Sequence, residues 1–197
     1  MNLVNVDTGA MYRCVALKAL RNEIGITEVQ KLEEMLEEIV IEIKREGDNQ
    51  IIFLDGENVS TQIRTSEVDN CVAKFAALAC VRNKVTPLQR KIGETQNVIM
   101  EGRDIGTTVF PNADVKIYLD ASMEARAKRR YKQNQEKGIE ISYEDVLENI
   151  KQRHKLETER EISPLVQAKD AIYIDSSNMT IEQVVDKVIE IIEQKRK

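Results

Sequence analysis

The sequence predicts an α/β fold in which crossover helices join the strands of a parallel sheet. Two observations lead to this prediction. Short apolar runs alternate with longer segments of helical period along the whole chain. Two of these runs, at residues 4–9 and 98–106, end in glycine turns with charged neighbours. Because ligands of open α/β sheets bind outside the carboxyl ends of the strands, both turns are candidate site segments.

Length and composition fit one domain, or one domain with a small insert. The chain has 197 residues, of which 42% are hydrophobic and 32% charged, and its net charge of −5 argues against generic nucleic-acid or membrane-surface binding. No apolar run approaches the ~20 residues of a membrane span, and no signal peptide is visible. Cys14, Cys71, Cys80 and the single His154 form no metal-binding pattern, so we expect reduced cysteines and a cytoplasmic protein.

The first third is expected to hold a strand, two helices and a hairpin-rich insert. Residues 3–7 form the strand, and Asp7 or Thr8 caps a helix over residues 9–21. Thr27 with Gln30 resembles a capping box that opens a helix to residue 38. The apolar period then changes to two, with turns at residues 47–49 and 55–58, which predicts hairpins within residues 39–63.

The rest of the chain continues the alternation of helices and strands. Thr65 or Ser66 caps a helix to about residue 78, and a second helix covers residues 80–95, where Pro87 predicts a bend or a break. The expected strands are residues 98–100, 115–120 and 171–175, and the expected helices are residues 123–137, 142–160 and an amphipathic C-terminal segment capped by Thr180.

Arginines recur at the predicted strand ends and helix starts. Arginine offers a planar fork of donors that suits phosphate oxygens, so an acidic chain with this pattern suggests a binder of a small polyanion. For any single arginine, a surface salt bridge is the favoured explanation. Arg13 and Arg103 favour function, because each lies near an aspartate and a glycine at a strand end. The arginines of this pattern are Arg13, Arg64, Arg82, Arg103, Arg126, Arg129, Arg130, Arg153 and Arg160.

Several motifs, taken in order, resemble those of bacterial cytidylate kinases. The segment DTGAMYR at residues 7–13 is similar to the D-[ST]-G-A-x-Y-R segment of that family. Further matches follow at residues 63–65, 81–82, 102–107, 110–111, 119–122, 126–130 and 164–165. Each motif is modest alone, but their order and spacing extend the resemblance over essentially the whole chain.

The resemblance implies a P-loop nucleoside monophosphate kinase fold that transfers a phosphoryl group from ATP, with Mg²⁺, to CMP or dCMP. The implied core is residues 1–38 and 64–197, with a lid at about 123–160, and residues 39–63 resemble the nucleotide-monophosphate insert. The resemblance implies a monomer, which could need the missing N-terminal segment, and the charge and apolar pattern given above argue against nucleic-acid and membrane partners.

The resemblance also implies roles for individual residues. Arg13 and Arg103 would hold the acceptor phosphate, with Thr8 nearby. Arg82 and Asp104 would read the cytosine edge, and Arg153 and Glu157 would lie at the sugar. The implied substrate-binding set also includes Asp7 and Tyr12, the implied catalytic residues are Arg103, Arg130 and Arg160, and the lid arginines are Arg126, Arg129 and Arg130.

One family motif has no match. The phosphate-binding loop, G-x-x-x-x-G-K-[ST], would precede residues 7–13, and neither Gly-Lys-Ser nor Gly-Lys-Thr occurs in these 197 residues. We therefore expect an N-terminally truncated copy lacking a strand–loop–helix unit of roughly thirty residues. Three interpretations remain open: an active kinase that starts further upstream, a non-catalytic remnant that binds CMP but not ATP, and a fragment that complements a separate phosphate-loop piece.

The expected truncation has a structural consequence. In the family the corresponding strand lies mid-sheet, so the strands at residues 98–100 and 115–119 would flank a gap. Buried unpaired backbone groups cost ~1–3 kcal/mol each, against the ~5–15 kcal/mol of a typical domain. We expect these residues alone to be poorly stable or prone to aggregation.

Overall fold

The computed structural model describes residues 3–47 and 49–195, which fall into two compact units. Unit 1 comprises Met1–Ile105 and Arg160–Pro164, and unit 2 comprises Gly106–Glu159 and Leu165–Lys197. Both contain parallel strand pairs joined through helices, which confirms the predicted α/β class. The expected division into core, lid and insert stays a prediction. Among the described residues, no helix is both long and apolar enough to cross a membrane.

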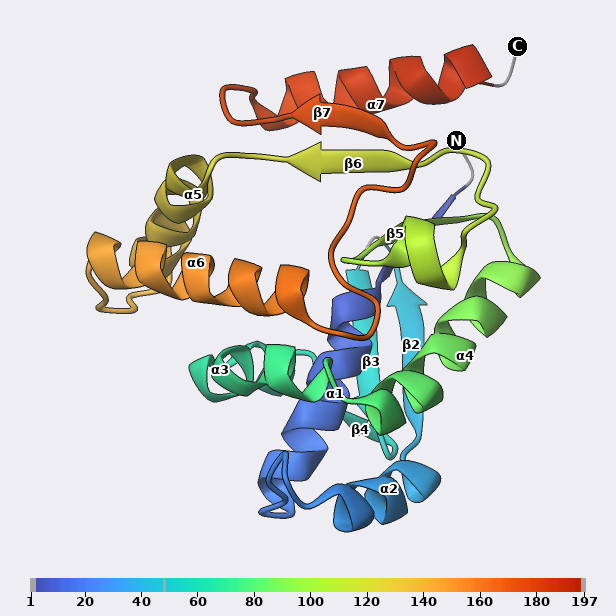
Figure 1. Cartoon of the computed structure of the whole chain (residues 1–197), viewed down its shortest axis with the longest axis vertical. Coiled ribbons are helices and arrows are strands. Elements are labelled where there is room, and N and C mark those ends of the chain that lie inside the picture. Colours follow the sequence, from blue (N-terminus) through green and yellow to red (C-terminus); the bar gives the residue numbers. More distant parts are fainter. Residues whose placement is uncertain (1–2, 48, 196–197) are drawn as a thin grey trace. The chain divides into compact units, whose positions relative to one another are not determined.

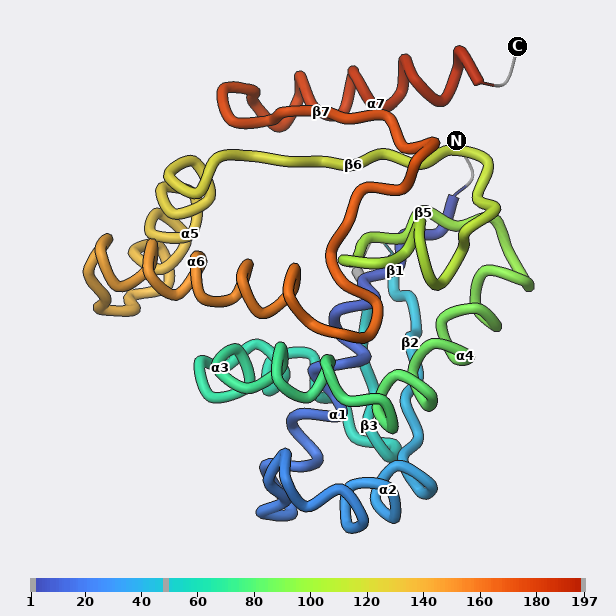
Figure 2. Tube along the Cα trace, in the orientation of Figure 1, coloured from blue at the N-terminus to red at the C-terminus, as the bar shows by residue number. Residues whose placement is uncertain are grey.

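The parallel strand pair of unit 1 brings the two glycine-turn segments together. Strand β1 (Val4–Asp7) pairs with β5 (Val98–Glu101), and the register places Asp7 opposite Glu101. Helix α1 (Thr8–Arg21) starts directly after β1; Figure 1 draws α1 in blue, and the trace in Figure 2, where β1 is labelled, leads from that strand into the helix. The two predicted site segments therefore both leave the sheet at the carboxyl end of its strands.

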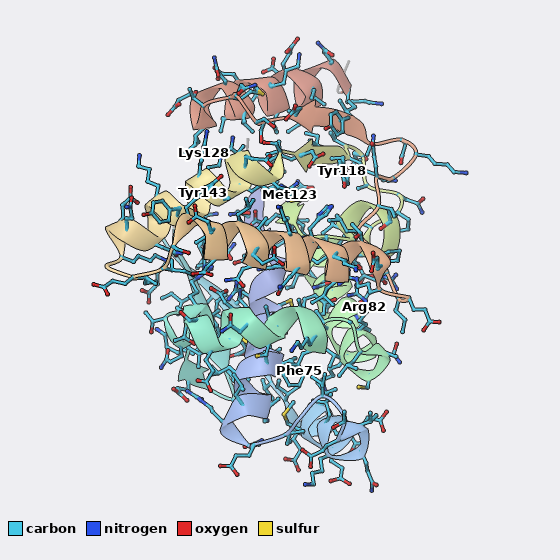
Figure 3. All side chains as sticks on the ribbon, turned by 60° about the vertical axis from the view of Figure 1, so that its left-hand side comes forward. Phe75, Arg82, Tyr118, Met123, Lys128 and Tyr143 are labelled. Carbon is cyan, nitrogen blue, oxygen red and sulfur yellow. The ribbon has the colours of Figure 1, made fainter. Side chains whose placement is uncertain are left out.

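The core of unit 1 is built around α1. Asp7 caps this helix by accepting a hydrogen bond from the Ala10 amide at 3.1 Å. Small buried residues such as Ala10, Cys14 and Ala16 let neighbouring helices approach closely. Those neighbours are α2 (Val29–Glu38), α3 (Ser66–Phe75) and α4 (Ala79–Thr95), of which α3 carries Phe75 and α4 carries Arg82, both labelled in Figure 3.

The predicted hairpins form a three-stranded antiparallel sheet within unit 1. Its strands are β2 (Ile41–Glu46), β3 (Asn49–Leu54) and β4 (Glu57–Asn58), followed by the 3₁₀ turn η1 (Gln62–Arg64). Gly56 adopts a φ of +86° in the second turn, a conformation that suits glycine. Of the first predicted turn, Asp48 lies outside the described residues.

Unit 2 repeats the parallel pairing with a helical hairpin inserted. Strand β6 (Ile117–Asp120) pairs with β7 (Ile172–Asp175), after a π-helical turn, η2 (Ile105–Val109). Helices α5 (Met123–Glu136) and α6 (Tyr143–Glu159) lie side by side, as Figures 1 and 2 show. The last element is α7 (Ile181–Lys195), which Thr180 caps through the Gln183 amide.

Two local expectations differ from the structure. Thr27 does not cap α2, because Glu28 occupies the N-cap position and its carboxylate instead accepts from the Gly25 amide at 2.9 Å. Of the bend or break expected at Pro87, the break does not occur, because α4 runs without interruption from Ala79 to Thr95, and the bend stays a prediction. Packing outweighs the local cost of proline there, since Val85 and Gln89 on either side are fully buried.

Strands β5 and β6 each pair along one edge only within the described ranges 3–47 and 49–195. Parallel strands are ordinarily buried between neighbours, yet Ile99 of β5 and Leu119 of β6 are 44% and 52% exposed. The low stability expected from open strand edges stays a prediction.

Candidate functional site

The ends of β1 and β5 are joined by a close contact between Thr8 and Gly102. The Thr8 hydroxyl donates to the Glu101 carbonyl at 2.5 Å. A Cβ on Gly102 would lie 2.5 Å from the Thr8 Oγ1 and 2.9 Å from carbons of Ile105. Real Cβ atoms do not approach other atoms this closely, so this turn requires glycine. The Gly-Arg-Asp segment is therefore held against the start of α1.

Three charged residues meet at these strand ends. Asp7 pairs with Arg64 at 2.9 Å, which adds to its role as the cap of α1. Glu101 faces Asp7 across the strand register. Partial desolvation by its neighbours, followed by the negative charge of Asp7, raises the pKa of the exposed Glu101, while the positive charges of Arg103 and Arg64 oppose that shift. The site thus keeps a protonatable carboxyl beside its arginines.

A buried carboxylate between two arginines forms the centre of the site in unit 1. Asp104 is 5% exposed and pairs with Arg82, whose side chain is 4% exposed. Its other oxygen lies 3.8 Å from Nη2 of Arg160, which is 6% exposed and donates from Nε to the Ser163 carbonyl at 2.7 Å. Arg82 also donates to the Ala76 carbonyl at 3.0 Å. Asp104 is therefore a buried carboxylate with a close partner in Arg82 and a more distant one in Arg160.

Tyr12 lies beneath this cluster. The Arg82 guanidinium lies over the Tyr12 ring, 5.4 Å from its centroid, in a cation–π contact. Burial raises the pKa of Tyr12, and the nearby charge of Arg82 opposes this shift. The structure thus brings together four of the predicted site residues: Tyr12, Arg82, Asp104 and Arg160.

Arg13 lies one residue further along α1 and has different partners. Its Nη1 donates to the Ile63 carbonyl of η1 at 2.9 Å, and its Nη2 lies 2.5 Å from Oδ1 of Asp69 on α3. The Arg13 and Asp69 side chains are 14% and 17% exposed. Arg13 is therefore held on two sides.

In unit 2, the predicted sugar residues form a pair on one helix. Nε of Arg153 donates to Oε1 of Glu157 at 2.8 Å, one helical turn apart on α6. The Glu157 side chain is only 8% exposed, whereas that of Arg153 is 40% exposed. Glu157 thus orients Arg153.

Two of the three predicted lid arginines anchor α5 to the ends of the strands of unit 2. Arg126 pairs with Asp120 at 2.5 Å and donates to the Ala121 carbonyl at 2.8 Å. Arg129 donates to the hydroxyl of Ser176 at 3.2 Å and also to its carbonyl. Arg130 is exposed on the same helix. The predicted lid role of all three stays a prediction.

Sequence reasoning did not single out Asp69 as a site residue. Asp69 is far from Arg13 along the chain and lies in the first turn of a helix, where an acidic residue is ordinary. No sequence signal distinguished it from Glu67 in the same turn. Within the part of the chain that the structure describes, no group of three or more His, Cys, Asp or Glu side chains could hold a metal.

Comparison with known proteins identifies the family. Residues 1–194 match the family model described as cytidylate kinase. The cytidylate kinase of Bacillus subtilis (strain 168) is 45% identical over 192 residues, covering 98% of this chain and 86% of that protein. The cytidylate kinase of Enterococcus faecalis is 45% identical over 195 residues, covering 99% and 86%, and that of Thermosipho melanesiensis is 43% identical over 197 residues, covering 100% and 88%. Together with the Gly-Arg-Asp turn and its buried arginine–aspartate cluster, these matches show that the chain belongs to the cytidylate kinase family.

Proposed function

We propose that this protein binds CMP or dCMP as a phosphoryl acceptor and phosphorylates it with ATP and Mg²⁺. The observation that supports this most directly is the Asp104 carboxylate, held between Arg82 and Arg160 with both arginines buried. A charged pair this far from solvent is expensive to build and is expected where recognition requires a fixed donor and acceptor.

The cluster suits cytosine. A cytosine base presents an amino donor at N4, and an aspartate accepts from such a group. Uracil presents a carbonyl oxygen at the corresponding position, which would face the Asp104 carboxylate without a proton between them. The Arg82 guanidinium supplies donors for the acceptor atoms of the cytosine ring. This arrangement favours CMP over UMP, because a buried polar group left unpaired by the wrong base is costly.

The arginines at the strand ends suit the acceptor phosphate. Arg13 and Arg103 lie on the two segments that follow the carboxyl ends of β1 and β5. Each guanidinium can donate to more than one phosphate oxygen. Phosphoryl transfer depends mainly on positioning and charge neutralisation, so these contacts would orient the acceptor oxygen and reduce the repulsion between the substrates. Asp7 supports this end of the strands by capping α1, and Thr8 supports it by donating a hydrogen bond to the Glu101 carbonyl.

The remaining implied roles stay proposals. Arg153, oriented by Glu157, would contact the sugar, and Arg130 and Arg160 would stabilise the transferring phosphoryl group. Arg126 and Arg129 would keep α5 in place as part of a lid. We also propose that the protein acts as a monomer.

The part of the active site that would bind ATP, the phosphoryl donor, has less support in these residues than the part that would bind CMP. Neither Gly-Lys-Ser nor Gly-Lys-Thr, with which a phosphate-binding loop ends, occurs in these 197 residues. These residues therefore do not fit a complete cradle for MgATP, and we assign no step of donor binding to them. When bound, Mg²⁺ would supply charge neutralisation between the donor phosphates.

The proposal is tested by titration calorimetry of the purified chain with CMP, dCMP and UMP, followed by an assay for ADP formation with MgATP. We expect CMP to bind at least about 100-fold more tightly than UMP, because the site depends on an amino donor at the base. Failure of the folded chain to bind CMP would overturn the proposal. CMP binding without ADP formation would instead identify a binding remnant.

Asp104→Asn provides the sharper test. Asparagine keeps the shape of the side chain but adds an amide donor that can reach a uracil oxygen. We expect the CMP-to-UMP preference to fall at least tenfold in this variant. The ratio is informative even if the variant is less stable, because both ligands report on the same folded fraction. An unchanged ratio would remove Asp104 from base recognition.

A further inference from the structure

The pair between Arg13 and Asp69 has a role that the family assignment does not supply. Asp69 Oδ1 lies 2.5 Å from Arg13 Nη2, and the Ile63 carbonyl accepts from Nη1 at 2.9 Å. The two partners come from α3 and η1, whereas Arg13 comes from α1. Three elements thus converge on one guanidinium that is only 14% exposed.

We propose that Asp69 is a positioning residue that fixes the Arg13 guanidinium for the acceptor phosphate. The inference rests on the proposed function, in which Arg13 contacts that phosphate. Two contacts to different nitrogens restrict rotation of the guanidinium plane. They use fewer donors than the group possesses, so others remain for a ligand.

The energetic reason is preorganisation. A free arginine side chain loses rotamer entropy when it is ordered. Because the Asp69 and Ile63 contacts already order Arg13 in the free protein, binding of the phosphate does not have to order it. The Asp69 carboxylate also offsets part of the positive charge of Arg13, and this weakens the attraction of the guanidinium for the phosphate. We infer that positioning outweighs charge offset, because the Ile63 carbonyl alone leaves the guanidinium free to pivot.

The competing explanation is that Asp69 only stabilises the N-terminus of α3. Glu67 provides a matched control, since it is acidic, exposed and in the same first turn. Within the described residues, no hydrogen bond or ion pair joins Glu67 to Arg13. Removing either carboxylate removes a similar favourable interaction with the helix dipole, but only Asp69 touches the arginine.

The test is calorimetric titration of the full chain with CMP and with cytidine, which lacks the phosphate. Asp69→Ala is expected to weaken CMP binding at least fivefold and to leave cytidine binding unchanged. Asp69→Asn keeps an oxygen at the position that faces Arg13 Nη2 and should stay within about threefold of the wild type. Glu67→Ala should bind both ligands as the wild type does.

A double-mutant cycle with Arg13→Ala isolates the pair. If Asp69 acts through Arg13, Asp69→Ala should have no further effect on CMP binding once Arg13 is alanine. An equal loss in both backgrounds, an equal loss for cytidine, or tighter CMP binding by Asp69→Ala and Asp69→Asn would overturn the inference. If Asp69→Ala does not fold, Asp69→Ser, whose hydroxyl ends short of the carboxylate oxygens, replaces it.

The two proposals fail differently. Absence of CMP binding by the folded wild type overturns the proposed function, and this inference with it. If Arg13→Ala weakens CMP binding but Asp69→Ala does not, the proposed function stands and only the role of Asp69 is overturned. If Arg13→Ala leaves CMP binding unchanged, Arg13 does not contact the phosphate, and the positioning role of Asp69 is overturned as well.

Discussion

The guanidinium of Arg82 and the carboxylate of Asp104 form an ion pair from which solvent is almost excluded, with side chains 4% and 5% exposed. Arg21 and Glu57 form a pair of the same chemistry at 2.7 Å, but their side chains are 40% and 51% exposed. The chain therefore contains a buried pair and an exposed pair whose energetic contributions should differ.

Arg82→Ala is expected to lower the free energy of unfolding by ~3–5 kcal/mol, because it leaves the Asp104 carboxylate buried without its main partner. Arg21→Ala should cost ~1 kcal/mol or less, since water replaces the lost contact. Urea unfolding followed by circular dichroism measures both. Equal losses for the two variants would contradict the assigned difference in burial.

Gly102→Ala is expected to destabilise the protein by ~1–3 kcal/mol, the usual cost of an atom forced into a filled space. The new Cβ would lie 2.5 Å from the Thr8 hydroxyl oxygen, so that hydroxyl must leave the Glu101 carbonyl. Gly25→Ala is the control, because a Cβ there lies 3.5 Å from the flexible Glu28 carboxylate. Thermal unfolding of the two variants should separate them, and an unchanged Tm for Gly102→Ala would refute the close contact.

Cys14 is expected to resist thiol reagents in the folded state. The residue is fully buried, and that burial raises the pKa of its thiol to about 12, so almost no thiolate is available at pH 8. Cys71 and Cys80 are partly buried, and their pKa values are also raised by burial, so they should react slowly. Timed labelling followed by mass spectrometry should find Cys14 unmodified until denaturant is added. Early labelling at Cys14 would mean that α1 opens readily.

The same shift predicts a pH dependence of stability. A thiol whose folded pKa is raised ionises first in the unfolded chain, so stability is fully present below the ordinary thiol pKa and declines as pH rises toward about 12. Between pH 8 and 10, the wild type should therefore lose more stability than Cys14→Ala. Urea titrations of both proteins at pH 8 and pH 10 measure the free energy of unfolding at each pH. An equal loss between the two pH values in both proteins would contradict this prediction.

Glu101→Gln is expected to raise the Tm at pH 7 and to have little effect near pH 4. The pKa of Glu101 is raised by partial desolvation and by Asp7, so the folded state favours the protonated carboxyl. The stability linked to that proton is present at low pH and is lost as pH rises through the folded pKa. Glutamine imitates the protonated form at every pH. A Tm difference that does not vary with pH would show that Glu101 ionises freely.

Local signals in the sequence predicted much of the candidate site. The strand ends at Asp7 and Glu101 were located by apolar runs that stop at glycine turns, and the structure pairs them in register. The Asp7 cap of α1 follows from the short-range geometry of a helix N-terminus, which a sequence records directly. The break expected at Pro87 is absent for the opposite reason, because a local preference gave way to burial of the helix on both sides of the proline.

The sequence by itself determined the order of the elements, the α/β class and the family, because these depend on patterns between near neighbours and on motifs kept in order. Only the tertiary structure decided which charges face one another. The contact between Arg13 and Asp69, and the place of Asp104 between Arg82 and Arg160, join residues far apart in the chain. Such pairs form because packing brings separate segments of the chain together, and burial then makes each partner necessary to the other.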